Sequence, residues 1–161
     1  MNIPAPHGHL EAVHREPPGT LRGAAVVGHP HPLMGGTMHT KAVFRAAQAL
    51  ADVKVAALRF NFRGVGTSTG SYGGGIGEKD DVLFSLDWLE ERHPELPLVA
   101  GGFSFGSMVA LSAAADDPRV VALFGIGLPV RSYDYGFLAD VQKPVLIVPV
   151  SYTQLTLPTN A

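Results

Sequence analysis

The most constraining feature of the sequence is a serine between two glycines, where an apolar segment meets a helix-like segment. Residues 102–106 read Gly-Phe-Ser-Phe-Gly and precede the helix-like run 107–115. A serine at a strand-to-helix corner needs small residues two positions before and after it, because larger side chains would collide in so tight a turn. Gly102 and Gly106 meet that requirement. The pattern predicts a strand, a sharp corner and a helix, with the Ser104 hydroxyl raised above the sheet.

Such a corner suits a nucleophile. The start of the following helix places the Phe105 N–H beside the serine, where a free amide and the helix dipole stabilise a developing anion. The pentapeptide is short, and glycines also flank serines in ordinary turns. The strand-then-helix context favours the nucleophile elbow over the ordinary turn.

Composition and charge exclude several classes of protein. The 161 residues suit one domain, and the 46% of hydrophobic residues can build a sizeable core. A net charge of −2 without a basic cluster argues against a nucleic-acid or anionic-membrane surface. The chain has no cysteine, so disulfides and thiolate metal sites are excluded. Residues 1–10 lack the features of a signal peptide, and no apolar run could span a bilayer, so we expect a cytoplasmic protein.

Apolar strands alternate with amphipathic helices after an opening hairpin. Val82, Leu86 and Leu89 form a buried stripe typical of such a helix. The alternation predicts an α/β fold, with a largely parallel sheet and helices on both faces. Ligands bind such sheets beyond the carboxyl ends of the strands. The predicted strands are 9–15, 21–28, 53–60, 98–103, 120–126 and 144–150, and the predicted helices are 38–51, capped by Thr37, 78–92 and 104–115.

The loop 28–37 follows an early strand and could supply a second oxyanion donor. Pro30 and Pro32 have no N–H, so the backbone N–H of His31 is the best candidate. The alternative is a rigid proline turn with half-exposed histidines. A divalent-metal site formed by His29, His31 and His39 is a weaker alternative, because prolines intervene and no carboxylate partner is evident.

A glycine-rich loop, 64–70, follows another strand. It could be interpreted as a phosphate loop, but it lacks the Lys-Ser/Thr ending and the G-x-G-x-x-G spacing. We favour a structural loop beside the edge of the sheet where the carboxyl ends of the strands meet. Arg59 and Arg63 bracket Asn61, just before this loop, and are expected to be solvated or paired rather than catalytic. Asp81 lies in the first turn of a helix, where acidic residues are expected in any case.

Taken together, these residues resemble the α/β-hydrolase superfamily and, more narrowly, small bacterial serine hydrolases without a lid. The resemblance covers about residues 9–149 and implies a nucleophile at Ser104, oxyanion donors at Phe105 and near His31, a small-molecule acyl substrate and no cofactor or metal. It extends no further than an esterase or a related acyl hydrolase. The matching pieces are His29 to Pro32 with Gly35, Gly36 and Thr37, Arg59 to Gly66 with Ser68 and Gly70, Gly77 and Glu78 with Asp81, and Gly102 to Gly106.

The chain departs from this superfamily in its acid and base. The superfamily order is Ser, then Asp or Glu, then His, yet all seven histidines here precede Ser104. No carboxylate follows the strand predicted at 144–150. Asp134 could serve as the acid in a variant arrangement. Tyr133, Tyr135 and Phe137 either line an acyl pocket or pack on the core.

The last residues fit neither a strand nor a helix. Residues 151–161 resemble vector read-through, so we expect an incomplete hydrolase domain at 1–150 followed by a non-native tail at 151–161. A complete relative would add roughly 50 residues of loop, strand and helix, including the acid and the base. This predicts a fold that lacks its last strand and helix, with marginal stability in solution and weak or no activity. The alternative function is a non-catalytic α/β-hydrolase-like binding domain.

Overall fold

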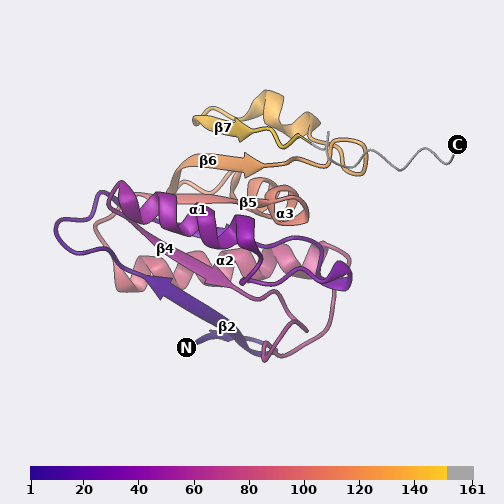
Figure 1. Cartoon of the computed structure of the whole chain (residues 1–161), viewed down its shortest axis with the longest axis horizontal. Helices are drawn as coiled ribbons and strands as arrows, with labels where there is room; N and C mark the ends of the chain where they lie inside the picture. Colours follow the sequence, from indigo (N-terminus) through magenta and orange to yellow (C-terminus); the bar gives the residue numbers. More distant parts are fainter. Residues whose placement is uncertain (152–161) are drawn as a thin grey trace, which may run out of the picture.

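The computed structural model describes residues 1–151 and contains a seven-stranded sheet with helices on both faces (Figure 1). The tail predicted at 151–161 therefore lies outside the described residues, apart from Ser151. The strand order is β1-β2-β4-β3-β5-β6-β7. The strands are β1 (Asn2–Ala5), β2 (Gly8–Arg15), β3 (Gly23–Gly28), β4 (Val55–Phe60), β5 (Leu98–Phe103), β6 (Val120–Ile126) and β7 (Val145–Val148).

The sheet is largely parallel, as the alternation of strands and helices predicts. β1 and β2 pair antiparallel, and β2 also runs antiparallel to β4. The pairs β3–β4, β3–β5, β5–β6 and β6–β7 are all parallel. The carboxyl ends of these parallel strands lie on one rim, which carries the loops after Gly28, Phe60 and Phe103.

Within residues 1–151, three α-helices cover the two faces of the sheet: α1 (Lys41–Asp52), α2 (Ile76–Arg92) and α3 (Phe105–Ala114). Successive residues of β3 point to opposite faces of the sheet. Val26 belongs to the buried cluster formed with α2 and α3, whereas Val27 packs with Val43 of α1 on the other face. The predicted stripe of α2 is buried in the larger cluster. Within residues 1–151, no helix combines the length and hydrophobicity that crossing a bilayer requires.

Two differences from the sequence prediction are larger than a shift of one or two residues at the end of an element. The four-residue strand β1 was not predicted; it exists because it pairs with β2 from Asn2↔Glu11 to Ala5↔Gly8. The first helix begins at Lys41 rather than at 38, and its N-cap is Thr40, not Thr37. The reason is tertiary: the Met38 amide donates to Asn61 Oδ1 at 2.8 Å, which holds this segment in the rim.

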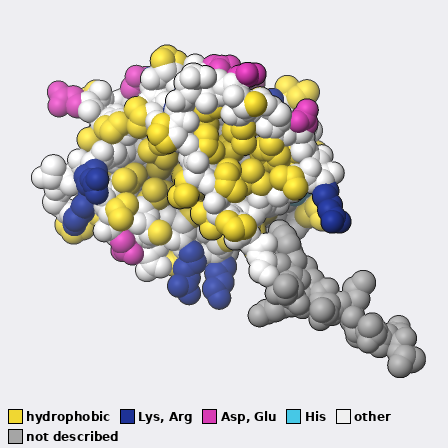
Figure 2. Space-filling model, turned by 90° about the horizontal axis from the view of Figure 1, so that it is seen from above, with side chains coloured by type: hydrophobic (Ala, Val, Ile, Leu, Met, Phe, Trp, Pro, Cys, Tyr) yellow, Lys and Arg dark blue, Asp and Glu magenta, His cyan; other side chains and the backbone are white. Residues whose placement is uncertain are grey.

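One surface of the fold is unusually apolar. A groove of about 340 Å³ lies between α1 and the β6–β7 end of the sheet. Figure 2 shows hydrophobic side chains gathered across this end of the molecule. Leu146 of β7 is 63% exposed and Val121 of β6 is 49% exposed. The groove is lined by Ala46, Ala49, Leu50, Val53, Val99, Ala122, Leu123, Phe124, Ile126, Leu146 and Val148.

Candidate active site

Ser104 occupies the corner between β5 and α3. Its backbone has φ 54° and ψ −121°, and Lys54 is the only other non-glycine residue with positive φ in the described chain. L-residues rarely adopt this conformation, and such strain gathers at functional sites. Ser104 is half-buried rather than sealed from solvent. Its hydroxyl makes no hydrogen bond to any residue among 1–151.

The two glycines around Ser104 are sterically required. A Cβ on Gly106 would overlap the carbonyl group of Gly28, which is backbone and cannot rotate away. A Cβ on Gly102 would lie 2.6 Å from the Gly106 carbonyl and 2.8 Å from the Gly28 oxygen. The corner is therefore tight because three backbone segments meet there: the end of β3, the end of β5 and the start of α3.

The backbone around the corner leaves amides available. The Ser104 amide donates to the Ile126 carbonyl at 2.9 Å and so continues the sheet ladder. The Phe105 amide has no acceptor among the described residues, and the same holds for the His31 amide. The Ser104 carbonyl accepts from the Ser107 amide at 2.9 Å and from Ser107 Oγ at 2.6 Å. Ser107, which the sequence analysis did not single out, thus holds the corner in place.

The structure brings His31 next to the elbow. The ring of His31 lies 4.9 Å from the ring of Phe105, so the residues of the two expected oxyanion donors are neighbours. His31 caps the short 3-10 helix η1 (Pro32–Met34), where its Nδ1 accepts from the Leu33 amide at 3.2 Å. Its Nε2 lies 3.0 Å from the Tyr72 hydroxyl. The side chain is thereby fixed, while the backbone N–H is left unpaired within residues 1–151.

His29 has a structural task instead of a metal-binding one. It is fully buried, its Nδ1 donates to the Pro30 carbonyl at 2.7 Å, and its Nε2 accepts from the Phe62 amide at 3.0 Å. Both ring nitrogens are engaged, so His29 joins the loop after β3 to the loop after β4. Burial, partly offset by the Pro30 carbonyl, lowers the pKa of His29 to about 4.

The glycine-rich loop is held by side chains rather than shaped for phosphate. Asn61 Nδ2 donates to Glu11 Oε2 at 2.7 Å, and Ser68 Oγ donates to the Asn61 carbonyl at 2.7 Å. The Thr67 amide, with Asn61, holds the pKa of Glu11 below its usual value. Arg63 pairs with the buried Asp81 at 2.8 Å. These contacts confirm that Arg63 is paired.

The remaining candidates come from the segment between β6 and β7. Asp134 is exposed, and its Oδ1 accepts from the Gly136 amide at 2.7 Å in a turn. The Tyr135 hydroxyl lies 3.1 Å from Ser107 Oγ. Tyr133 is in edge contact with Phe105 at 6.2 Å and packs on the core, as does Phe137. Tyr135 is thus linked to the Ser104 corner through Ser107. No histidine of residues 1–151 hydrogen-bonds to Ser104.

A mostly parallel sheet with a strained serine at the strand–helix corner defines the class of α/β hydrolases. The family described as serine aminopeptidase, S33, matches residues 26–140, and the chain belongs to this α/β-hydrolase family.

Solved structures of lidless relatives are similar to this chain. An α/β serine hydrolase without a lid from Xanthomonas campestris is 37% identical, with a TM-score of 0.81 over 91% of this chain and 68% of that chain. An α/β serine hydrolase homologue from Coxiella burnetii is also 37% identical, with a TM-score of 0.85 over 92% of this chain and 72% of that chain. These relatives confirm the fold expected from the sequence.

A curated relative is an uncharacterized protein of Rickettsia prowazekii, 36% identical over 147 residues. The match covers 89% of this chain and 62% of the relative. The chain therefore spans about three fifths of the length of this relative.

Proposed function

We propose that Ser104 is the nucleophile of an esterase-like serine hydrolase. Its hydroxyl oxygen would attack the carbonyl carbon of an acyl ester, and the resulting oxyanion would accept hydrogen bonds from the Phe105 and His31 amides. Collapse of this intermediate expels the alcohol and leaves an acyl-serine, which water then hydrolyses. The observation that carries the proposal is the strained corner at φ 54°, flanked by an amide with no partner among residues 1–151.

The proton of Ser104 needs an acceptor. A serine hydroxyl is a weak nucleophile until a base removes its proton. His29 and His31 lie on the same rim, but their ring nitrogens are engaged with other groups. We therefore propose that the general base and its acid partner come from sequence beyond residue 151 in the whole protein. Asp134 is the alternative candidate for the acid within the described chain, and its Oδ1 accepts from the Gly136 amide.

An external base can stand in for the missing imidazole. We would incubate the 161-residue chain with p-nitrophenyl acetate, with and without added imidazole, and locate acetyl groups by peptide mass spectrometry. We expect little hydrolysis without imidazole, because the corner alone lacks a base. With imidazole, we expect acetylation concentrated on the peptide that contains Ser104, since oxyanion donors next to a half-buried hydroxyl that makes no hydrogen bond among residues 1–151 still favour attack there.

Two variants control this experiment. Ser104→Ala should abolish the acetylated peptide, while Ser71→Ala, which removes an exposed serine elsewhere, should leave it unchanged. Labelling of lysines or other serines with none on Ser104 would contradict the proposal. A strong burst of hydrolysis without imidazole, lost in Ser104→Ala, would support the nucleophile and refute the expected weakness of this chain.

A non-catalytic binding domain is the second candidate function. It is favoured by one observation, the lack of any hydrogen bond between Ser104 and a histidine of residues 1–151. Sequencing the source gene past the codon for Val150 separates the two candidates. A downstream Asp followed by a His in the same reading frame supports the hydrolase, whereas their absence favours the binding domain.

A further inference from the structure

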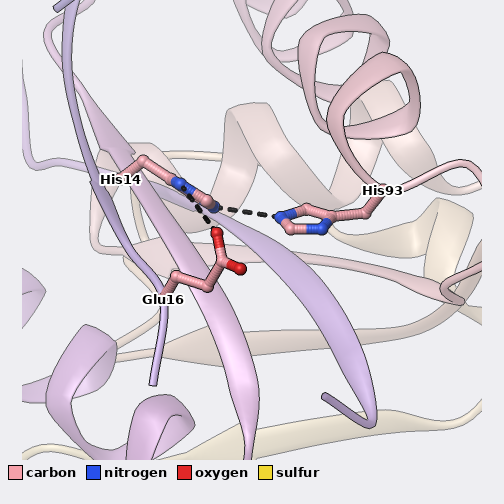
Figure 3. Close-up of side chains that lie close together, drawn as sticks. All are labelled: His14, Glu16 and His93. Carbon is pink, nitrogen blue, oxygen red and sulfur yellow. Dashed lines mark hydrogen bonds and ion pairs between the residues drawn. The ribbon is translucent and has the colours of Figure 1, made fainter. Parts of the chain in front are cut away.

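Two histidines and a glutamate converge far from the rim that carries Ser104. His14 is near the end of β2, Glu16 follows that strand, and His93 caps the end of α2. One nitrogen or oxygen atom from each of the three lies within 4.8 Å of the others. Figure 3 shows the two rings pointing toward each other, with the glutamate side chain beside them. We propose that His14, Glu16 and His93 bind one divalent transition-metal ion, with zinc as the best fit.

The spacing of the two rings matches a shared ion. Nε2 of His14 and Nε2 of His93 are 3.3 Å apart. Two imidazole nitrogens at about 2.05 Å from a tetrahedral zinc lie roughly 3.3 Å from each other. Without an ion, the same separation is a long hydrogen bond between the two rings. The rings are therefore placed so that an ion can enter with little movement of either one.

The backbone and its neighbours hold both rings in position. The His93 amide donates to the Leu89 carbonyl at 2.8 Å, and the His93 carbonyl accepts from the Leu96 amide at 3.1 Å. The ring of His14 rests against the edge of Trp88 at 5.1 Å, and its side chain is only 9% exposed. Burial, with the neighbouring His93, lowers the pKa of His14.

Glu16 supplies the third ligand and faces an opposing charge. Its Oε2 lies 3.9 Å from His14 Nδ1, which is not the ring nitrogen that meets His93, and 3.5 Å from Arg92 Nη2. Glu16 must therefore rotate to reach an ion bound by the two Nε2 atoms. The Glu16 side chain is 42% exposed and that of Arg92 58% exposed, so both can rotate. Arg92 competes with a cation for this carboxylate. Two imidazoles and a carboxylate favour zinc and similar ions over magnesium or calcium, and the fourth position is open to water.

The bound ion would act on stability rather than on catalysis. Arg15, between the ligands His14 and Glu16, pairs with Ala57, and Ala57 lies toward the start of β4. His93 precedes β5, whereas Ser104 follows it. The cluster is therefore at the opposite end of the sheet from the elbow. An ion there would tie the end of β2 to the end of α2 and would stabilise the folded chain by binding only that state.

The test uses the full 161-residue chain, free of tags and treated with a chelator. We expect calorimetric titration with zinc to show one high-affinity site per chain, accompanied by a higher melting temperature. Free zinc at about 100 times its Kd shifts the folding equilibrium about 100-fold toward the native state. Magnesium at the same concentration should produce neither effect.

Variants assign the ligands. We expect His14→Ala and His93→Ala each to weaken zinc binding at least tenfold. Removing a residue that only hydrogen-bonds to a metal ligand already lowers metal affinity by about tenfold or more, and removing the ligand itself should cost at least as much. Glu16→Gln should weaken it less, and Arg92→Ala should strengthen it by freeing the carboxylate. His39→Ala removes an exposed histidine outside the cluster and should change nothing.

Two results would overturn the proposal. One is the absence of saturable zinc binding, and the other is unchanged binding in the double variant His14→Ala/His93→Ala, which would place the ion elsewhere. If a variant fails to fold, the unsubstituted chain still decides. The imidazole NMR signals of His14 and His93 must shift on adding one equivalent of zinc, and shifts confined to other histidines would refute the site.

Discussion

At the scale of single residues, His29 makes the stability of the folded chain depend on pH. Its pKa in the folded chain is about 4, against an ordinary value of 6.5. A depressed histidine pKa means that the unfolded chain binds more protons, so stability is full above about pH 6.5 and is lost as the pH falls toward 4. The shift corresponds to about 3 kcal/mol. Protonation is costly because Nε2 could no longer accept from the Phe62 amide.

The free energy of unfolding, measured in urea between pH 7 and 5, checks this prediction. We expect His29→Gln, which keeps a donor and an acceptor but does not titrate, to flatten the pH dependence. His39→Gln is the matched control, because it removes an imidazole that is exposed rather than buried. Equal slopes in the two variants would mean that the buried ring does not set the pH dependence.

The site residues divide by whether local pattern or distant contact determines them. Ser104 and its two glycines follow from local spacing, because a tight corner imposes its own sequence. Ser107 holds the Ser104 carbonyl from three positions away, and Tyr135 contacts the Ser107 hydroxyl across 28 positions. The bond from His31 to Tyr72 spans 41 positions. No spacing rule relates residues so far apart, so only the folded chain shows them together.

At the scale of elements, strands with buried faces were the most predictable. β5 and β6 have the bounds expected from the sequence, because continuous apolar runs identify central parallel strands. The predicted start of α1 was wrong because Met38 is held by distant residues. Its amide donates to Asn61 Oδ1 and its carbonyl accepts from Arg59 Nη1, and local helix propensity does not reveal such contacts. β1 was missed because four residues around Pro4 carry no alternation, and pairing with β2 alone makes them a strand.

The junction between α3 and β3 makes a sharp prediction for Gly106. Replacing glycine with alanine inside a helix normally stabilises it by about 1 kcal/mol. At Gly106 we expect the opposite sign, a loss of about 3 kcal/mol or more, because the new Cβ would overlap the Gly28 carbonyl. Unfolding in urea measures this loss. Gly74→Ala controls for backbone strain alone, since that residue has φ 68° with open space around it, and should cost about 1 kcal/mol.

At the scale of the whole molecule, the apolar end of the sheet dominates the surface. The side chains of Leu146, Ile147 and Val148 are 63%, 44% and 39% exposed along β7, which has no strand on its outer side among residues 1–151. Exposed apolar strands at a sheet edge invite pairing with other chains. Each ~100 Å² of apolar surface removed from water by association is worth about 2.5 kcal/mol. The 161-residue chain is therefore expected to self-associate.

Leu146→Lys tests whether this surface is responsible. The side chain points largely into solvent, so we expect the free energy of unfolding to change by no more than about 0.5 kcal/mol. Self-association, measured by light scattering across a range of concentrations, should fall strongly, because a charge on an edge strand opposes pairing. Ile76→Lys is the matched control: Ile76 is 78% exposed but lies at the start of α2, away from the groove. An equal fall in both variants would mean that added charge, rather than loss of this surface, keeps the chains apart.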